Sequence, residues 1–346
     1  MVAAKNSPFL RNKKVVNPKV MFVLWTFRIL VGILFLISGF IKVNDITGFA
    51  YKLEEYFHVF ERNLFPGFIH FTPFSIAIAA AIAIFEVFTA ITLLLGYVPR
   101  FTTSSMLLMI IFFTLLTGYS FRTGLVSDCG CFGDVLKLTP LESFIKDLVL
   151  MGMIGFLFVH REKITNFWEN IVNDILVPIV FAGTCFLTWY NWANLPMLDF
   201  LPYKVGADIK HNTTTLNEKG EFIAKDYTPI GLDCKMDEFE GNTFIIIMRD
   251  MASINSDEYV SLTNLAIRLS RKEIKVLGAT ASTRDVKSAT IANYKIPFCV
   301  ASMDQTVLKT MIRSNLGFML LKNGICLGKW HGNNLPQDTE VLGLLH

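Results

Sequence analysis

Two cysteines separated by one glycine, Cys129-Gly130-Cys131, form the pair whose residue types and spacing could most directly do chemistry. In an oxidising compartment, thiols this close can be joined as a disulfide, and the bridge closes a very small ring. Strained, exposed disulfides have higher reduction potentials and are the labile or catalytic ones. Gly130 lacks a Cβ and permits the unusual backbone that such a ring requires. The spacing therefore favours a dithiol/disulfide switch.

Two other interpretations of this pair stay open. The cysteines could form a structural bridge that tightens their loop, or they could supply half of a metal site whose other ligands lie elsewhere. The neighbouring carboxylates of Asp128 and Asp134 disfavour a thiolate. This argues mildly against a strongly nucleophilic cysteine.

The elements that position the pair are expected to cross a membrane. The 346-residue chain is 52% hydrophobic and only 18% charged, whereas about a quarter of the residues in an ordinary soluble domain are charged. A bilayer core of about 30 Å requires roughly 20 apolar residues per helix. The stretches that meet or nearly meet that length are 21–43, 74–98, 104–119, 141–159 and 171–192. We predict an α-helical membrane bundle of about five helices, in which 104–119 is the weakest span.

Basic residues near the helix ends predict the orientation. Lysines and arginines gather before the first span, and Arg100, Arg161 and Lys163 lie in the loops after the second and fourth spans. These segments should be cytoplasmic. An odd number of crossings then places the cysteine loop and everything after Trp192 outside the cytoplasm. The net charge of +3 is small and forms no long basic stripe, so nucleic-acid binding has no electrostatic support.

Charged residues within or beside the predicted spans are further candidates for a site. Glu86 lies near the middle of the second span, and Arg28 lies about a third of the way into the first. Such residues are costly in a bilayer and usually face the bundle interior in pairs. A Glu86–Arg28 pair is possible. Glu86 could carry a proton or line a cavity, or it could simply form a polar lock between helices. Lys42 and Asp45 mark the outer end of the first span, where Lys42 can reach water.

The segment 49–60 (FAYKLEEYFHVF) mixes aromatic and charged residues. It is too short and too charged to span the bilayer, so we predict an interfacial helix near the outer mouth of the bundle. It could cap a cavity near Cys129, or simply lie on the membrane surface.

After about residue 193 the composition becomes that of a soluble domain. Strands are predicted at 242–248, 274–279 and 298–301, helices at 256–270, 284–294 and 306–312, and a hairpin at 318–330 with an Asn323-Gly324 turn. This alternation predicts a mixed α/β sheet. The predicted parts are a basic cytoplasmic N-terminus (1–20), the helical membrane domain (21–192), a strap and linker (193–240) and an α/β domain (241–346).

The helical part resembles the DoxX and MauE families of bacterial inner-membrane proteins. The resemblance rests on SGFIKVNDITGFAYKLEEYF from Ser38, FEVFTAITLLLG from Phe85 and SDCGCFGD from Ser127. The last segment is similar to the Ser-Cys-Gly-Cys-Phe-Gly signature of MauE-type proteins, with Asp128 inserted. The C-terminal part resembles, in topology, the thioredoxin-like domains that some such proteins carry as a fusion.

This resemblance implies a function in thiol or sulfur redox chemistry. MauE-type proteins are associated with disulfide formation in a periplasmic enzyme, and DoxX-type relatives include a proposed thiosulfate:quinone oxidoreductase subunit. It therefore implies redox chemistry of Cys129 and Cys131 that is coupled to a quinone, with the direction of electron flow left open, together with an inner-membrane location and a periplasmic C-terminal domain.

The C-terminal domain departs from a redox thioredoxin fold where the chemistry would occur. The place of the Cys-x-x-Cys pair reads Arg249-Asp250-Met251-Ala252-Ser253, and no proline precedes the closing hairpin. The remaining cysteines lack the spacing of a redox pair, so we expect buried free thiols at Cys185, Cys234, Cys299 and Cys326.

Two functions remain open. The protein could be a membrane thiol redox protein in which Cys129 and Cys131 exchange with an external thiol. Alternatively, it could be a non-catalytic subunit or assembly factor of an envelope complex, whose α/β domain docks a periplasmic or membrane protein.

Overall fold

A computed structural model describes residues 17–126, 130, 132–133, 135–136, 138–168, 170–217, 220, 222–224 and 227–345. They fall into two compact units, each assembled from segments far apart in the sequence. The first lies within Met1–Ser38, Phe85–Ser127 and Thr139–Phe181, and the second within Gly39–Ile84, Asp128–Leu138 and Ala182–His346. Helices α1 (Pro18–Asn44), α3 (Ser75–Leu95) and α6 (Asn170–Ala193) each contribute to both units.

Membrane-spanning helices are present, as the composition predicted. Among the described residues, four helical segments are long and apolar enough to cross a bilayer, namely Pro18–Asn44, Phe68–Leu95, Pro99–Thr123 and Ile171–Ala193. The span expected at 104–119 is the 25-residue helix α4 (Pro99–Thr123) and is not short. Helix α5 (Pro140–Val159) is not one of these four segments, because Glu142, Lys146 and Asp147 lie within its first eight residues.

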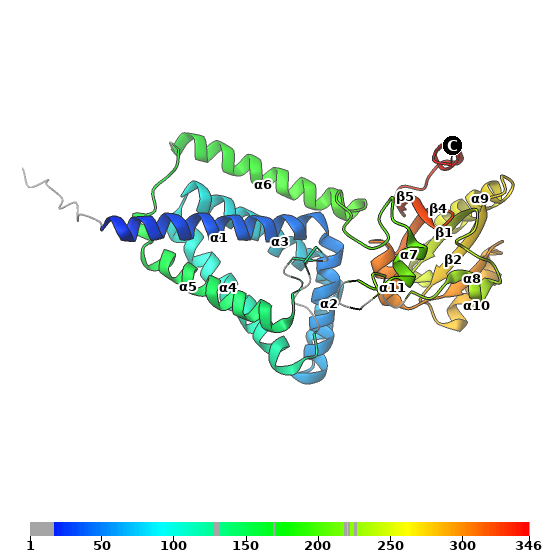
Figure 1. The fold of residues 1–346 in the computed structure, drawn as a ribbon, viewed down its shortest axis with the longest axis horizontal. Coiled ribbons are helices and arrows are strands. Elements are labelled where there is room, and N and C mark those ends of the chain that lie inside the picture. The colour runs from blue at the N-terminus through cyan, green and yellow to red at the C-terminus, as the bar shows by residue number, and fades with distance from the viewer. Residues whose placement is uncertain are drawn as a thin grey trace, which may run out of the picture. The chain divides into compact units, whose positions relative to one another are not determined.

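Helix α5 nevertheless returns along α4, as Figure 1 shows. At 1.5 Å per residue, α4 rises about 37 Å and α5 about 30 Å. The segment after α5 then meets the turn before α4. Phe167 N donates to Leu95 O at 2.9 Å, and Arg100 pairs with Glu162 at 2.8 Å. The 20 residues of α5 therefore cover nearly the same distance as α4 in the opposite direction.

The ends of this helix pair are specified by local sequence. Helix α4 ends at Gly124, whose positive φ of 65° suits a residue without a Cβ. Helix α5 begins with a capping box, in which the Thr139 hydroxyl accepts from Glu142 N and the Glu142 carboxylate accepts from Thr139 N.

The helix predicted at 49–60 is confirmed, and it is longer at both ends. Helix α2 (Ile46–Asn63) is amphipathic and buries Ile46, Thr47, Phe49, Ala50, Leu53 and Tyr56. The 3-10 helix η1 (Phe68–Phe74) follows and packs against α2, with the Phe57 and Phe71 rings 5.9 Å apart.

The C-terminal domain is the mixed α/β sheet that the sequence predicted. Its five strands have the order β3-β2-β1-β4-β5. Strand β1 pairs parallel with β2 and antiparallel with β4. Their bounds are β1 (Asn242–Met248), β2 (Lys275–Thr280), β3 (Cys299–Ser302), β4 (Leu316–Lys322) and β5 (Ile325–His331). The hairpin turns at Asn323-Gly324, both with positive φ. This arrangement fits a thioredoxin-like domain.

Helices cover both faces of this sheet (Figure 1). Alternate residues of β1 face opposite sides, so Phe244 and Ile246 join one hydrophobic cluster and Ile245 and Ile247 the other. The first cluster includes residues of α9 (Ser256–Ser270) and α12 (Asp338–Gly343), with α10 (Arg284–Tyr294) at its margin. The second includes residues of α7 (Ile209–Thr214), α8 (Ile230–Cys234) and α11 (Gln305–Met311).

Candidate functional site

The cysteine loop joins α4 to α5, and Cys129 and Cys131 themselves lie outside the described residues. Its described glycines adopt conformations that L side chains rarely take. Gly130 has φ +67° and Gly133 has φ +52°. A Cβ added to Gly130 would lie 3.0 Å from Lys52 Cγ, and one added to Gly133 would lie 3.3 Å from Ile41 Cγ2. The loop therefore runs close against α2 and the end of α1.

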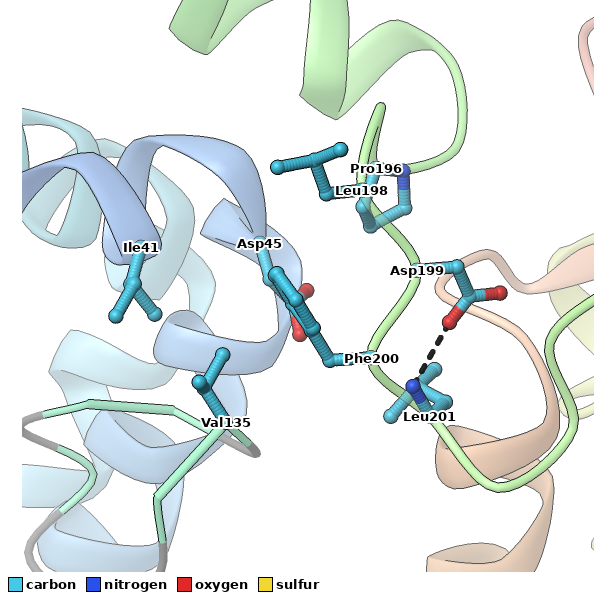
Figure 2. Close-up of a pocket in the computed structure, with 8 residues that line it drawn as sticks. All are labelled: Ile41, Asp45, Val135, Pro196, Leu198, Asp199, Phe200 and Leu201. Atoms are coloured by element: carbon cyan, nitrogen blue, oxygen red, sulfur yellow. Dashed lines mark hydrogen bonds between the residues drawn. The ribbon is translucent and has the colours of Figure 1, made fainter.

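A small pocket lies where this loop meets the strap that follows α6 (Figure 2). Its lining residues are Ile41, Asp45, Val135, Pro196, Leu198, Asp199, Phe200 and Leu201. Phe200 of the strap and Asp45, between α1 and α2, both line this pocket (Figure 2). The Asp199 carboxylate accepts a hydrogen bond from Leu201 N at 3.0 Å, which holds the strap in a turn.

Asp45 is a fixed anion of this pocket. Its carboxylate caps the N-terminus of α2 by accepting from Gly48 N at 2.8 Å. The Arg313 guanidinium also binds it, with Nε 2.9 Å and Nη2 2.9 Å from Oδ2. A Cβ on Gly48 would meet Asp45 Oδ2 at 2.3 Å, so a larger residue here would displace this carboxylate. The structure thus gives Asp45 structural partners that the sequence did not reveal.

Lys42 is buried, with 3% of its surface exposed, and its Nζ lies 5.5 Å from the centre of the Phe49 ring. The expectation that it reaches water from the end of α1 is therefore wrong, because the surrounding side chains cover it. The ammonium lies within cation–π range of an aromatic face instead.

Arg28 binds the end of helix α3. Its Nε donates to Leu93 O at 2.8 Å, its Nη2 to Leu94 O at 2.8 Å and its Nη1 to Thr165 O at 2.9 Å. Glu86 is buried in α3, about 10 Å along the helix axis from Leu93. The guanidinium thus uses all three nitrogens on backbone carbonyls, and the structure does not bring Arg28 to Glu86 as a pair. A proton-carrying role for Glu86 stays a prediction.

A second buried carboxylate of the helical part was missed by the sequence analysis. Asp147 of α5 is 1% exposed; it accepts from Thr117 Oγ1 at 3.0 Å and pairs with Lys146 at 2.8 Å. Asp147 lies two turns into α5, and Thr117 two turns before the end of α4, so the contact ties together the two helices that carry the cysteine loop. The charged residues near the start of α5 were the available signal.

A cluster of opposite charges around Tyr51 was also missed. It joins α2 to the α/β domain within the second compact unit. Arg249 donates to Tyr51 Oη, and Lys309 Nζ lies 4.2 Å from the centre of the Tyr51 ring. Lys309 also pairs with Glu54 at 3.2 Å. Burial raises the pKa of the Tyr51 phenol, while the Arg249 and Arg313 charges oppose that rise.

The edge after β1, where a redox thioredoxin fold would carry its cysteines, is occupied by hydrogen-bonded polar side chains. Asn315 Oδ1 accepts from Asp250 N at 2.8 Å, and Asn315 Nδ2 donates to Ser253 Oγ at 2.7 Å. Arg249 N donates to Asn315 O at 2.9 Å. These residues hold the edge together and offer no thiol.

The expectation of free thiols is wrong for two cysteines. Cys234 of α8 and Cys299 of β3 form a disulfide across 65 residues. Cys185 and Cys326 are free. Burial raises the pKa of the Cys326 thiol to about 11, which keeps it protonated and unreactive near neutral pH.

These features define the class of protein, a multispanning membrane protein with an α/β domain after its last membrane helix. Residues 20–160 match the family model described as methylamine utilisation protein MauE. This match confirms the resemblance of the helical part to MauE. The chain is also 27% identical over 171 residues to Protein TlpB of Flavobacterium psychrophilum. That match covers 47% of this chain and 43% of the relative. No solved structure matches the chain.

Proposed function

We propose that this protein exchanges disulfides at the outer surface of the membrane through Cys129 and Cys131. The observation that carries the proposal is the MauE match, because residues 20–160 include both cysteines and the helices on either side of them. The left-handed backbone of Gly130 supports it, since this conformation is accessible to glycine at little cost.

The exchange balances as a two-electron transfer. A substrate thiolate attacks the Cys129–Cys131 disulfide, forms a mixed disulfide and releases one protein thiol. The second substrate thiol displaces the remaining protein sulfur. Two substrate thiols thereby become a disulfide, and the protein is left with two thiols that must be reoxidised.

The oxidant that we propose for this step is a quinone dissolved in the bilayer, which accepts two electrons and two protons. Buried carboxylates fit a need for proton transfer within a membrane protein. Glu86 and Asp147 are both buried in the helical part. Of the two, Asp147 lies on a helix that directly adjoins the cysteine loop in the chain.

The contacts within the first compact unit support a chain that crosses the membrane five times. The turn between α3 and α4 lies beside the segment after α5, to which the Arg100–Glu162 pair joins it. It also contacts the start of α6, where Tyr97 Oη donates to Asp174 Oδ1 at 2.6 Å. This face carries Arg100, Arg161 and Lys163, so we assign it to the cytoplasm. Helix α6 leaves this face and, with its 24 residues, is long enough to reach the other side.

The disulfide of the α/β domain supports the same orientation. Disulfides persist in oxidising compartments and are rare in the cytosol. Because Cys234 and Cys299 are bonded, we place the domain outside the cytoplasm, in the periplasm of a bacterial inner membrane.

Thiol trapping in intact cells, with and without respiratory quinone, tests the proposed function. The Cys129–Cys131 pair should become reduced when quinone is depleted and be oxidised again when quinone is restored. A Cys326→Ala chain provides the control, because that buried thiol should not take part. Two results together would contradict the proposal. The cysteine pair would stay in one redox state under both conditions, and the Cys129→Ser and Cys131→Ser proteins would still function.

A second candidate function is a non-catalytic subunit or assembly factor. It is favoured by the polar network of Asn315, Asp250 and Ser253 at the edge where thiols would act. In that case a periplasmic or membrane protein should co-purify with the chain after gentle solubilisation, and should do so equally with the Cys129→Ser, Cys131→Ser variant.

A further inference from the structure

We infer that α2 is an intramolecular ligand of the α/β domain, which recognises the acidic, tyrosine-bearing segment of this helix through a basic face. The basic face consists of Arg249, Lys309 and Arg313. Arg249 directly follows β1, Lys309 lies on α11, and Arg313 lies two residues after the end of α11. Their partners are Asp45, the N-cap of α2, and Tyr51 and Glu54 on α2 itself. All of them belong to the second compact unit.

The first part of the recognition is a charge pair of low exposure. The side chains of Arg313 and Asp45 are 6% and 16% exposed. Nε and Nη2 of the guanidinium both bind the carboxylate, and Nη1 donates to Lys309 O at 2.6 Å. A planar guanidinium that uses all of its nitrogens in this way is held in one orientation. The pair therefore fixes how the segment directly after α11 meets the start of α2.

The second part is the aromatic ring. Besides the close Lys309 ammonium, the guanidinium carbons of Arg249 and Arg313 lie 5.0 Å and 5.9 Å from the centre of the Tyr51 ring. Cations within about 6 Å of an aromatic face are attracted by its quadrupole. The phenol oxygen meanwhile accepts from Arg249. One tyrosine thus contacts every member of the basic face.

The basic face lies beside the edge of the sheet that is functionally important in redox thioredoxin folds. Arg249 directly follows β1, at the edge where a redox thioredoxin fold would present its cysteines. Helix α2 therefore contacts this edge at Arg249, while Asp250, Ala252 and Ser253 beside it stay exposed. Because Asp45 also lines the pocket beside the cysteine loop, the same contact helps to set the shape of that pocket.

Hydrogen–deuterium exchange of the full-length protein in lipid nanodiscs tests this inference. Lys309→Glu and Glu54→Lys each place like charges opposite one another, at positions that are only about a quarter exposed. Each should accelerate exchange in α11 and in the loop after β1 by roughly tenfold, since like charges at an interface are strongly unfavourable. The double variant should restore slow exchange, because the ion pair is re-formed with its direction reversed.

Arg268→Glu is the matched control. It breaks the Arg268–Asp338 pair at 2.8 Å elsewhere on the same domain, and should leave exchange in α11 unchanged. Arg313→Glu provides a second disruption of the basic face itself. Exchange in α11 that is no faster in Lys309→Glu and Arg313→Glu than in Arg268→Glu would overturn the inference. The measurement reports hydrogen exchange in α11 and involves no thiol chemistry. The inference can therefore fail while the proposed function stands, and the reverse also holds.

Discussion

Arg28 donates a hydrogen bond from Nε to the carbonyl oxygen of Leu93 at 2.8 Å, so that a side chain of α1 satisfies the end of α3. Carbonyls in the last turn of a helix have no partner within that helix. In a membrane such groups must be satisfied by other parts of the protein. The arginine thus acts as a C-terminal cap supplied by a neighbouring helix.

Arg28→Gln should therefore destabilise the helical part. The substitution removes the positive charge and at least one of three charge-assisted bonds, for an expected loss of about 2–3 kcal/mol. Thermal unfolding in detergent measures the effect. Arg28→Lys should be intermediate, because an ammonium cannot reproduce the fork of the guanidinium. Unchanged unfolding of Arg28→Gln would refute the assignment of this cap.

Asp147→Ala should weaken the association of α4 with α5. It removes the acceptor of Thr117 Oγ1 and the partner of Lys146. The Thr117 hydroxyl still has Phe113 O at 3.0 Å as an acceptor, so the expected loss is about 0.5–2 kcal/mol. Reversible unfolding in mixed micelles measures it. Thr117→Val gives the comparison, and strictly additive losses in the double variant would show that the two residues do not interact.

Reduction of the Cys234–Cys299 disulfide should destabilise the α/β domain. For a closed loop of this length, the chain-entropy estimate is about 4 kcal/mol. Calorimetry of the full chain with and without reductant should show the loss in the Cys129→Ser, Cys131→Ser background, where the other pair is absent. If the Cys234→Ser, Cys299→Ser chain unfolded at the same temperature as its parent, the bond would have no stabilising role.

Cys326 should make the α/β domain lose stability as the pH becomes alkaline. Its folded pKa of about 11 lies above that of an exposed thiol. The unfolded state therefore loses its proton first as the pH rises. The associated stability is fully present below the unfolded pKa of about 8.5 and is lost as the pH approaches 11. Denaturant titrations from pH 7 to pH 11 measure it, and Cys326→Ala should flatten this part of the profile.

Gly130→Ala should disturb the cysteine loop. Alanine at a φ of +67° costs roughly 1–2 kcal/mol. The added Cβ would also press on the Lys52 side chain. We expect slower oxidation of the adjacent cysteines in a thiol-trapping time course. Gly152→Ala in α5, where a Cβ meets nothing within 4 Å, is the control, and equal rates in the two variants would rule out a special role for Gly130.

The membrane helices were largely predictable because apolar runs report directly on lipid exposure. The extent of α4 was not, since its ends are rich in hydroxyl residues that lower the hydropathy. In the structure, Thr103 and Ser104 donate to the carbonyls of Pro99 and Arg100. These bonds allow polar residues to continue the helix.

The strands and helices of the α/β domain followed from their alternation, and the Asn323-Gly324 turn specified its hairpin. The contacts made across long sequence distances were not predictable. Cys234 and Cys299 lie in separate elements, and no local spacing marks them as partners. Asp45 stood out at the end of the first span, but nothing in the sequence marks Arg313, 268 residues away, as its partner.

The disulfide also determines how the α/β domain would carry a mechanical load. Tension applied between the membrane anchor and the C-terminus would pass directly from α8 to β3 through the sulfur atoms. The two cysteines are 65 positions apart, and the segment between them, which contains β1, α9, β2 and α10, is bypassed by this covalent path. Reduction would release about 230 Å of extensible chain, so the redox state of a single bond sets how far the domain can be stretched.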